Sequence, residues 1–476
     1  MTEIDASINS LLNHLKSSNQ FFRDASLIQS QYLSGGAINR NDKLQLKLKD
    51  GSLKNLVMRR GRGAQVPGTL SREQEFRLVQ FMHDAGVPVP RPIAMVKHDQ
   101  TNASFFDWCE GTTDARQMLK IFSSLPDDFL ADLAGQLGRV LGKIHSDEVS
   151  LALQKEDQPP IGPCPLDGLS ASIRSLRDGF EKVNYPASYL EFAVGRVCEE
   201  ASTVTTARGA VLCHNDFRLG NLMLIAPSVQ DLGDPSGASN QRERYPYWLI
   251  KAVLDWEFAG WGDPMSDLGW LTAPAWRFGG AHPVAGFLPL EPFLSGYQLT
   301  NPTFHGSWVN ELSYWQRFAQ VRWAVIASQQ GERALSSDEE TLELMITGLM
   351  TASILKPVVE HYLGREIGPH GVLSSAIAPQ LKLDADDGTR HLPEADTLLK
   401  EAWRLLRQQV AQNGQVTGKL KYEILMAANA LRLAMGAQKH LSDDKTCRKM
   451  GGQDTSQYER ELARDLAIWT FTLGDN

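Results

Sequence analysis

The stretch HNDFRLGN, residues 214–221, constrains this chain more than any other. It lies between two short apolar runs, 210–213 and 222–225, so its polar side chains are held between two strand-like segments. An Asp five residues before an Asn, with a fixed turn between them, suits a phosphoryl-transfer loop. There the carboxylate accepts a proton from a substrate hydroxyl, and the amide oxygen holds a magnesium ion. The pattern predicts Asp216 as a general base and Asn221 as a metal ligand.

Two further residues of this loop fit the same interpretation. Arg218 follows the aspartate by two residues, where a guanidinium could neutralise charge on the transferred phosphoryl group. Asn215 stands where a tight turn often needs a positive φ, which asparagine tolerates better than most residues. The alternative is an ordinary surface turn, because Asn and Asp side chains bond to their own backbone in turns. The loop by itself does not decide between the two.

A second carboxylate stands at the end of another short strand. Residues 251–254 are suited to a strand, and Asp255 ends it in the string LDWEFAGWGDPMSDLGWL. A carboxylate placed there could bind the magnesium ion that bridges the nucleotide phosphates. We interpret Asp267, in the same string, as a structural residue. Asp216 and Asp255 could each be an ordinary turn residue. Because both occur in the order and setting that a phosphoryl-transfer site needs, this explanation is the weaker one.

Together, HNDFRLGNLML and LDWEFAGWGDPMSDLGWL resemble motifs of the aminoglycoside phosphotransferase and choline kinase-like family, which shares the protein-kinase-like fold. The likeness is strongest to the kinase-like domains fused to some acyl-CoA dehydrogenases, and it extends from about Phe22 to about Leu363. The family's usual Gly between His and Asp is Asn215 here. The resemblance implies a phosphotransferase that uses ATP and Mg²⁺ and acts on an alcohol group of a small molecule.

The resemblance also assigns residues to the nucleotide. Gly35 and Gly36 match the turn that covers the phosphates, where glycines let backbone amides approach the oxygens. Arg59 in VMRRG stands where a kinase places its phosphate-binding Lys, and a guanidinium can bind phosphate with two donors. Glu75, in the next predicted helix, matches the glutamate that holds this cation. From spacing alone, surface charge is the plainer explanation for Arg59 and Glu75.

The string ASFFDWCEG resembles the hinge of the family. In that role, backbone groups of Asp107, Trp108 and Cys109 would form hydrogen bonds with the adenine. The boundary between the two lobes would then fall near Gly111.

Hydrophobic periodicity predicts the main elements. Residues 3–18 have helical spacing, with an apolar face made of Ile4, Ile8, Leu11, Leu12 and Leu15. From Ser26 the period becomes two, which predicts a small antiparallel sheet with strands at 27–33, 43–49 and 55–60 and a turn at Asp50-Gly51. Residues 129–145 carry an apolar helical stripe that ends at His145, which we interpret as a structural histidine.

These elements predict an α+β chain with a bilobal protein-kinase-like fold and a C-terminal helical bundle. The small antiparallel-sheet N-lobe would occupy residues 1–110 and the mostly helical C-lobe residues 111–366. A linker at 367–390 and a helical bundle at 391–476 would follow. The bundle shows no chemistry, so it suits a lid or interaction role, and copies of the chain could associate through it. A polar insertion between Ile225 and Leu249 separates the two motif strings.

Composition narrows the function classes. A net charge of -8 disfavours a nucleic-acid binder, which needs a basic surface. Five widely spaced cysteines offer neither a disulfide framework nor a metal-binding pair, which favours a cytoplasmic location. No apolar run is long enough for a membrane span. The expected partner is a small hydroxylated substrate, with a hydroxyacyl-CoA as one candidate. The alternative function is that of a nucleotide-binding pseudokinase acting as a regulatory or interaction module.

Overall fold

The structure is a computed structural model that describes residues 3–33, 39–61, 68–98, 101–122, 125–184, 186–204, 206–225, 250–336 and 342–367. It forms two compact units. The first combines residues 1–175 and 201–319, and the second combines 176–200 with the described residues from 320 onward. Gly35, Gly36, most of the polar insertion and the predicted linker and C-terminal bundle lie outside the described residues. The predicted domain boundaries therefore stay predictions.

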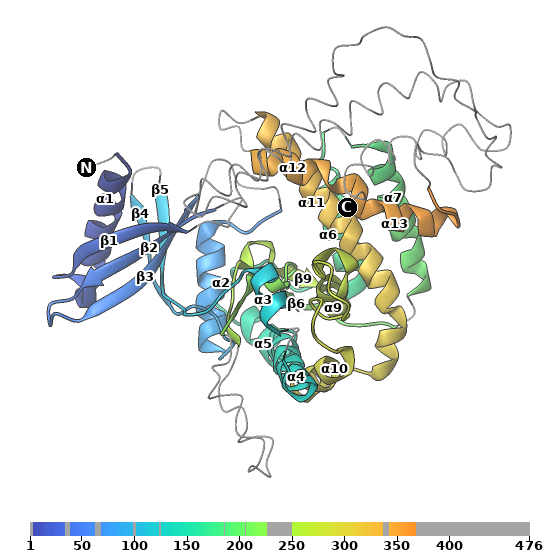
Figure 1. The fold of residues 1–476 in the computed structure, drawn as a ribbon, viewed down its shortest axis with the longest axis horizontal. Coiled ribbons are helices and arrows are strands. Elements are labelled where there is room, and N and C mark those ends of the chain that lie inside the picture. The colour runs from blue at the N-terminus through green and yellow to red at the C-terminus, as the bar shows by residue number, and fades with distance from the viewer. Residues whose placement is uncertain are drawn as a thin grey trace, which may run out of the picture. The chain divides into compact units, whose positions relative to one another are not determined.

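The first unit contains a five-stranded antiparallel sheet with the strand order β1-β2-β3-β5-β4 (Figure 1). Its strands are β1 (Ser26–Leu33), β2 (Asn39–Lys47), β3 (Leu53–Gly61), β4 (Pro92–His98) and β5 (Thr101–Asp107). The three predicted strands are confirmed, and Gly51 takes a φ of 84° in the predicted turn. The sequence did not predict β4 and β5, because Pro88, Pro90 and Pro92 indicate a stiff extended passage at the start of this region.

Helix α1 (Glu3–Ser18) packs on one face of this sheet, as its apolar stripe predicted (Figure 1). Side chains alternate between the two faces of a strand, so the adjacent residues Arg59 and Arg60 point in opposite directions. Arg60 shares the α1 face with Leu56 and Met58, and there it pairs with the buried Asp42 at 3.2 Å. Arg59 is thereby directed to the opposite face.

Helix α2 (Arg72–Asp84) begins with a capping box, in which Ser71 and Gln74 bond to each other's backbone amide groups. The other α-helices among the described residues are α3 (Ala115–Phe122), α4 (Asp127–Ile144), α5 (Asp147–Gln154), α6 (Gly168–Phe180), α7 (Ser188–Glu200), α9 (Pro264–Thr272), α10 (Leu290–Thr300), α11 (Leu312–Ser336), α12 (Leu342–Leu349) and α13 (Thr351–Leu363). Two short antiparallel pairs lie among them, β6 (Val211–Cys213) with β9 (Gly260–Gly262), and β7 (Leu222–Leu224) with β8 (Ile250–Val253). The predicted α+β class is confirmed.

Within the described part of the chain, no helix combines the length and apolarity that a membrane crossing requires.

Helices α4 and α10 lie side by side because glycines remove the side chains between them (Figure 1). A Cβ atom on Gly296 would overlap the carbonyl oxygen of Gly135, and one on Gly138 would overlap that of Phe293. The contact therefore brings backbone against backbone, and it fixes Tyr297 of α10 near His145 at the end of α4.

We expect Gly296→Ala to destabilise the protein by about 1–3 kcal/mol, because the added methyl group must push two helices apart. The measurement is the urea midpoint of unfolding. Gly195→Ala is the matched control, since a Cβ atom there meets nothing within 4 Å and lies in another helix, α7. An equal midpoint in the two variants would contradict the role given to this glycine.

Candidate active site

The loop between β6 and β7 has the backbone that its sequence predicted. Asn215 adopts a φ of 63°, in the left-handed region. Asp216 follows and is only 7% exposed. Its Oδ1 atom accepts hydrogen bonds from Nε of Arg218 at 2.9 Å and Nε1 of Trp270 at 3.1 Å, while its Oδ2 atom accepts one from Nδ2 of Asn221 at 2.6 Å. Both carboxylate oxygens are thus held in fixed positions.

The two predicted metal ligands approach from neighbouring strands. The amide nitrogen of Asn221 also donates to the carbonyl of Asp216, at 2.9 Å, and no described residue donates to its amide oxygen. Asp255 lies two residues after β8 and has a φ of 64°, and the amide of Leu254 just before it donates to the carbonyl of Asn221 at 2.8 Å. An amide oxygen and a carboxylate are hard ligands that suit Mg²⁺. The residues present therefore fit a magnesium site.

Helix α9 holds the loop through the carboxylate of Asp267. This completely buried group accepts hydrogen bonds from the backbone amides of His214 and Asn215, each at 2.7 Å. Nε2 of His145 also lies 3.1 Å from the carboxylate, and the other ring nitrogen of His145 lies 2.8 Å from the Tyr297 hydroxyl. The structural roles predicted for Asp267 and His145 are confirmed.

The charges in this buried region follow from these contacts. Burial favours a protonated Asp267, but the hydrogen bond and charge of His145, with His214 nearby, hold the pKa of Asp267 below its ordinary value. Burial lowers the pKa of His214, against the opposing effect of Asp267 and Asp216. A neutral His214 ring matches its bonds, since Nε2 donates to the Leu254 carbonyl and Nδ1 accepts from the Asp216 amide.

Arg59 lies at the centre of a cluster of carboxylates. Its Nη1 atom is 3.2 Å from Glu75, as the resemblance implied, and its Nη2 atom is hydrogen-bonded to Asp255 and lies 3.5 Å from Glu257. Burial opposes its charge, but the three carboxylates more than compensate and raise the pKa of Arg59. Its buried Nε atom has no hydrogen-bond partner among the described residues, so it could donate to a phosphate oxygen. This part of the chain fits a polyphosphate.

Glu257 and Trp270 also belong to this region, although the sequence did not single them out. Glu257 is buried, and burial together with the charge of Asp255 raises its pKa well above the ordinary value. Its signal was the string DWE, which places a second carboxylate two residues after Asp255. Trp270 lies three residues after Asp267 in α9, so both project toward the same loop. The sequence shows this spacing, but it does not show that Trp270 contacts the loop.

Two of the three predicted hinge residues already donate their backbone amide to a carbonyl of the protein. The amide of Asp107 donates to the carbonyl of Arg91 at 2.9 Å, and that of Trp108 donates to the carbonyl of Asn55 at 3.3 Å. No described residue bonds to the amide of Cys109. The Cys109 amide is therefore the donor best placed among the three for an adenine.

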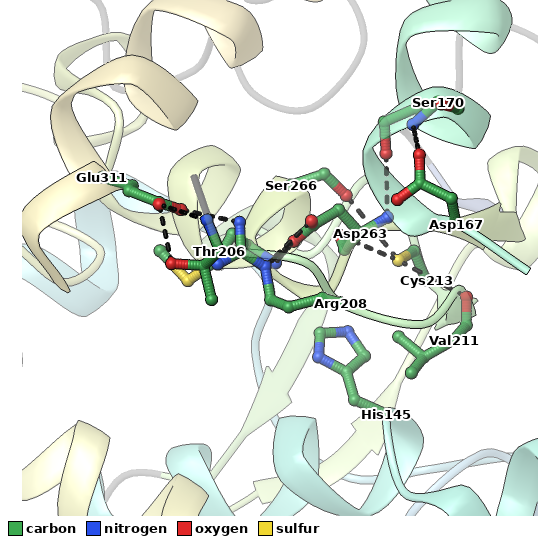
Figure 2. Close-up of polar contacts among 12 residues, drawn as sticks. His145, Asp167, Ser170, Thr206, Arg208, Val211, Cys213, Asp263, Ser266 and Glu311 are labelled. Carbon is green, nitrogen blue, oxygen red and sulfur yellow. Dashed lines mark hydrogen bonds and ion pairs between the residues drawn. The ribbon is translucent and has the colours of Figure 1, made fainter. Parts of the chain in front are cut away.

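A buried network fixes the start of α9 (Figure 2). Nε of Arg208 lies 2.9 Å from both carboxylate oxygens of Asp263, the N-cap residue of this helix, and Nη2 lies 2.8 Å from Glu311. Figure 2 shows Arg208 pointing toward both carboxylates, with Ser266 and Cys213 beside Asp263. Burial raises the pKa of Asp263 to about 6, although Arg208 opposes this rise. The network anchors the helix that carries Asp267 and Trp270.

Residues 31–229 match the model of the phosphotransferase enzyme family. The matched segment is similar to that family. It contains the predicted base and Asn221, while Asp255 follows it in the chain. No curated protein matches the chain.

Solved structures of related proteins were also found. A putative aminoglycoside phosphotransferase from Ralstonia eutropha shares 17% identity over 71% of this chain and 93% of its own, with a TM-score of 0.48. A choline/ethanolamine kinase family protein from Mesorhizobium loti shares 14% identity over 75% and 95%, with a TM-score of 0.44. An aminoglycoside phosphotransferase from Streptomyces rimosus, in complex with ADP and streptomycin, shares 14% identity over 68% and 100%, with a TM-score of 0.37.

We expect Asp267→Asn to destabilise the protein by about 3–5 kcal/mol at neutral pH, since an amide cannot accept both backbone donors and pair with His145. Because the folded-state pKa of Asp267 lies below the unfolded value, its stabilisation is present above the ordinary Asp pKa and is lost on further acidification. The difference in unfolding free energy between the unaltered protein and Asp267→Asn should therefore become smaller below about pH 4.

Urea midpoints measured between neutral and acidic pH check this expectation. Asp24→Asn is the control, since that carboxylate is exposed. A difference in urea midpoint between the unaltered protein and Asp267→Asn that stays constant as the pH falls would contradict the role of the carboxylate charge.

Proposed function

We propose that the protein is an ATP-dependent phosphotransferase that moves the γ-phosphate to a hydroxyl group of a small molecule. The contact of Arg59 with Asp255 carries this proposal, because it joins the proposed phosphate-binding strand to the proposed metal-binding loop. The family match over residues 31–229 supports the same reaction class.

In this mechanism each side chain acts from the position described above. Asp216 accepts the proton of the acceptor hydroxyl, and its hydrogen bonds from Trp270 and Asn221 keep the accepting oxygen oriented. Arg218 offsets negative charge that develops on the transferred group. Asn221 and Asp255 would hold Mg²⁺, which when bound neutralises charge on the phosphate oxygens.

In this proposal Arg59 can be held either by Asp255 or by Glu75 and Glu257 together. In the structure it is bonded to Asp255, and it is also close to Glu75 and Glu257. If Asp255 holds Mg²⁺, Glu75 and Glu257 would still hold the guanidinium, which would be free to donate to phosphate oxygens. Glu257 is therefore a positioning residue in our proposal.

The substrate is a small hydroxylated metabolite. The resemblance to kinase-like domains fused to acyl-CoA dehydrogenases supports a hydroxyacyl-CoA as one candidate. The aminoglycoside named for the Streptomyces rimosus structure is a second type of acceptor to test.

We expect Asp216→Asn to lower kcat by at least about a hundredfold, because the amide cannot accept the hydroxyl proton. Nucleotide affinity should stay within about twofold, since Asp216 contacts the acceptor in this proposal. Transfer of radiolabelled γ-phosphate to a panel of hydroxylated metabolites measures kcat, and calorimetry with ATP measures affinity. Full activity of this variant would overturn the mechanism, and ATP binding without any transfer by the unaltered protein would favour a pseudokinase.

Asp255→Ala should act differently, because it removes a ligand of the metal that accompanies the nucleotide. We expect its affinity for Mg²⁺-ATP to fall by about tenfold or more, while affinity for ATP measured in EDTA changes little. Equal losses with and without Mg²⁺ would show that the carboxylate does not act through the metal.

Trp270→Phe keeps an aromatic ring in the core but removes the hydrogen bond to Asp216. We expect kcat to fall by about tenfold, the value of one hydrogen bond to a charged group, with unchanged nucleotide affinity. The same transfer assay and calorimetry measure both quantities. An unchanged kcat would show that this bond does not position the base.

A further inference from the structure

Aromatic rings lead away from the proposed base toward the solvent. The Trp270 ring, whose nitrogen bonds to Asp216, has its centroid 5.3 Å from that of Trp276. The Trp276 ring in turn lies 6.5 Å from that of Phe278. Exposure rises along this run, from 2% at Trp270 to 42% at Phe278. We call these three rings the aromatic shelf.

The outermost ring of the shelf is held in a strained backbone conformation. Phe278 has a φ of 49°, which bulky side chains rarely adopt. The chain around it is fixed, because the amide of Gly280 donates to the carbonyl of Arg277 at 2.8 Å and Gly286 packs on that carbonyl too closely for any Cβ atom. A fixed turn that exposes a large apolar ring, two ring contacts away from the ring that bonds to Asp216, suits a binding surface.

The charged side chains near the shelf are the carboxylate of Asp216 at its inner end and the guanidinium groups of Arg218 and Arg277. Residues 268–290 include no Asp or Glu, but they include Arg277. Arg277 donates twice to the carbonyl of Thr272 and has no ion pair with a described carboxylate. The guanidinium of Arg218, which is ion-paired with Asp216, lies over the Trp276 ring, 5.0 Å from its centroid. The segment that carries the shelf, residues 268–290, thus contributes one guanidinium group and no carboxylate.

We propose that the aromatic shelf is the acceptor-binding surface and that it takes hydroxylated molecules with a flat apolar portion that are uncharged or anionic. This inference rests on the proposed function. The rings would contact the apolar portion, while the hydroxyl group reaches Asp216 at the inner end. An anionic group on the acceptor would be attracted by Arg218 and Arg277.

The same arrangement disfavours cationic acceptors. An aromatic face attracts cations, but Arg218 already occupies the face of Trp276. A polycationic amino sugar would also meet Arg277 and would find no carboxylate among residues 268–290. The shelf therefore discriminates by charge as well as by shape.

Four acceptors with the full-length protein, ATP and Mg²⁺ test this proposal: benzyl alcohol, phenyllactate, choline and kanamycin. We expect transfer to the two aromatic alcohols, with kcat/KM at least tenfold above that for choline or kanamycin. Phe278→Ser should raise the acceptor KM about tenfold and leave kcat and ATP affinity within twofold, because it removes only a binding contact. Phe21→Ser is the matched control, since Phe21 is an exposed ring near the N-terminus, 61% exposed against 42% for Phe278, and should change none of these values.

The outcomes separate this inference from the proposed function. Transfer restricted to kanamycin or choline would overturn the shelf proposal and leave the phosphotransferase proposal intact. An acceptor KM that is unchanged in Phe278→Ser would overturn the shelf proposal in the same way. Transfer to none of the four acceptors, and to no other hydroxylated metabolite in the larger panel, would overturn both.

Discussion

The buried carboxylate of Asp267 is the interaction on which the candidate site depends. It accepts the backbone amides of His214 and Asn215, so it fixes the loop just before Asp216 without using any side chain of that loop. The side chains of the loop remain available for chemistry. A buried charge is tolerated here because it receives several donors at once, including the ring of His145. Burying this carboxylate costs desolvation free energy, but the hydrogen bonds that it accepts give the loop a fixed geometry.

The second feature is an excess of negative charge around Arg59. Arg59 faces three carboxylates, Glu75, Asp255 and Glu257, and even with the charge of the nearby Arg72 there are two guanidinium groups against three carboxylates. The result is visible in Glu257, whose pKa is raised by burial and by Asp255. A divalent cation would relieve this repulsion, whereas a polyphosphate alone would increase it. The charges of the described residues therefore fit a metal-nucleotide complex better than a nucleotide by itself.

The sequence predicted the elements with strong local signals. The apolar stripe of residues 3–18, the alternation in β2 and the turn at Gly51 all follow from short-range patterns, and all are confirmed. The positive φ of Asn215 followed from the few residue types that tolerate it. Strand β4 was missed because it lies at the edge of the sheet and nearby prolines weaken its local strand signal, and its inner neighbour β5 was missed because the string ASFFDWCEG was interpreted as the hinge. For the site, the ion pair of Arg59 with Glu75 followed from the family resemblance, and spacing alone did not favour it.

What the sequence determined by itself is the set of chemical groups and their order: an Asp and an Asn on one turn, an Asp after a later strand, and two adjacent arginines. The tertiary structure decided which of these groups meet. Arg59 rather than Arg60 reaches the carboxylates because α1 covers the other face of the sheet. Trp270 bonds to Asp216 because α9 is anchored beside the loop through Asp263 and Arg208. Contacts between residues far apart in the chain depend on packing, which local patterns of side chains do not encode.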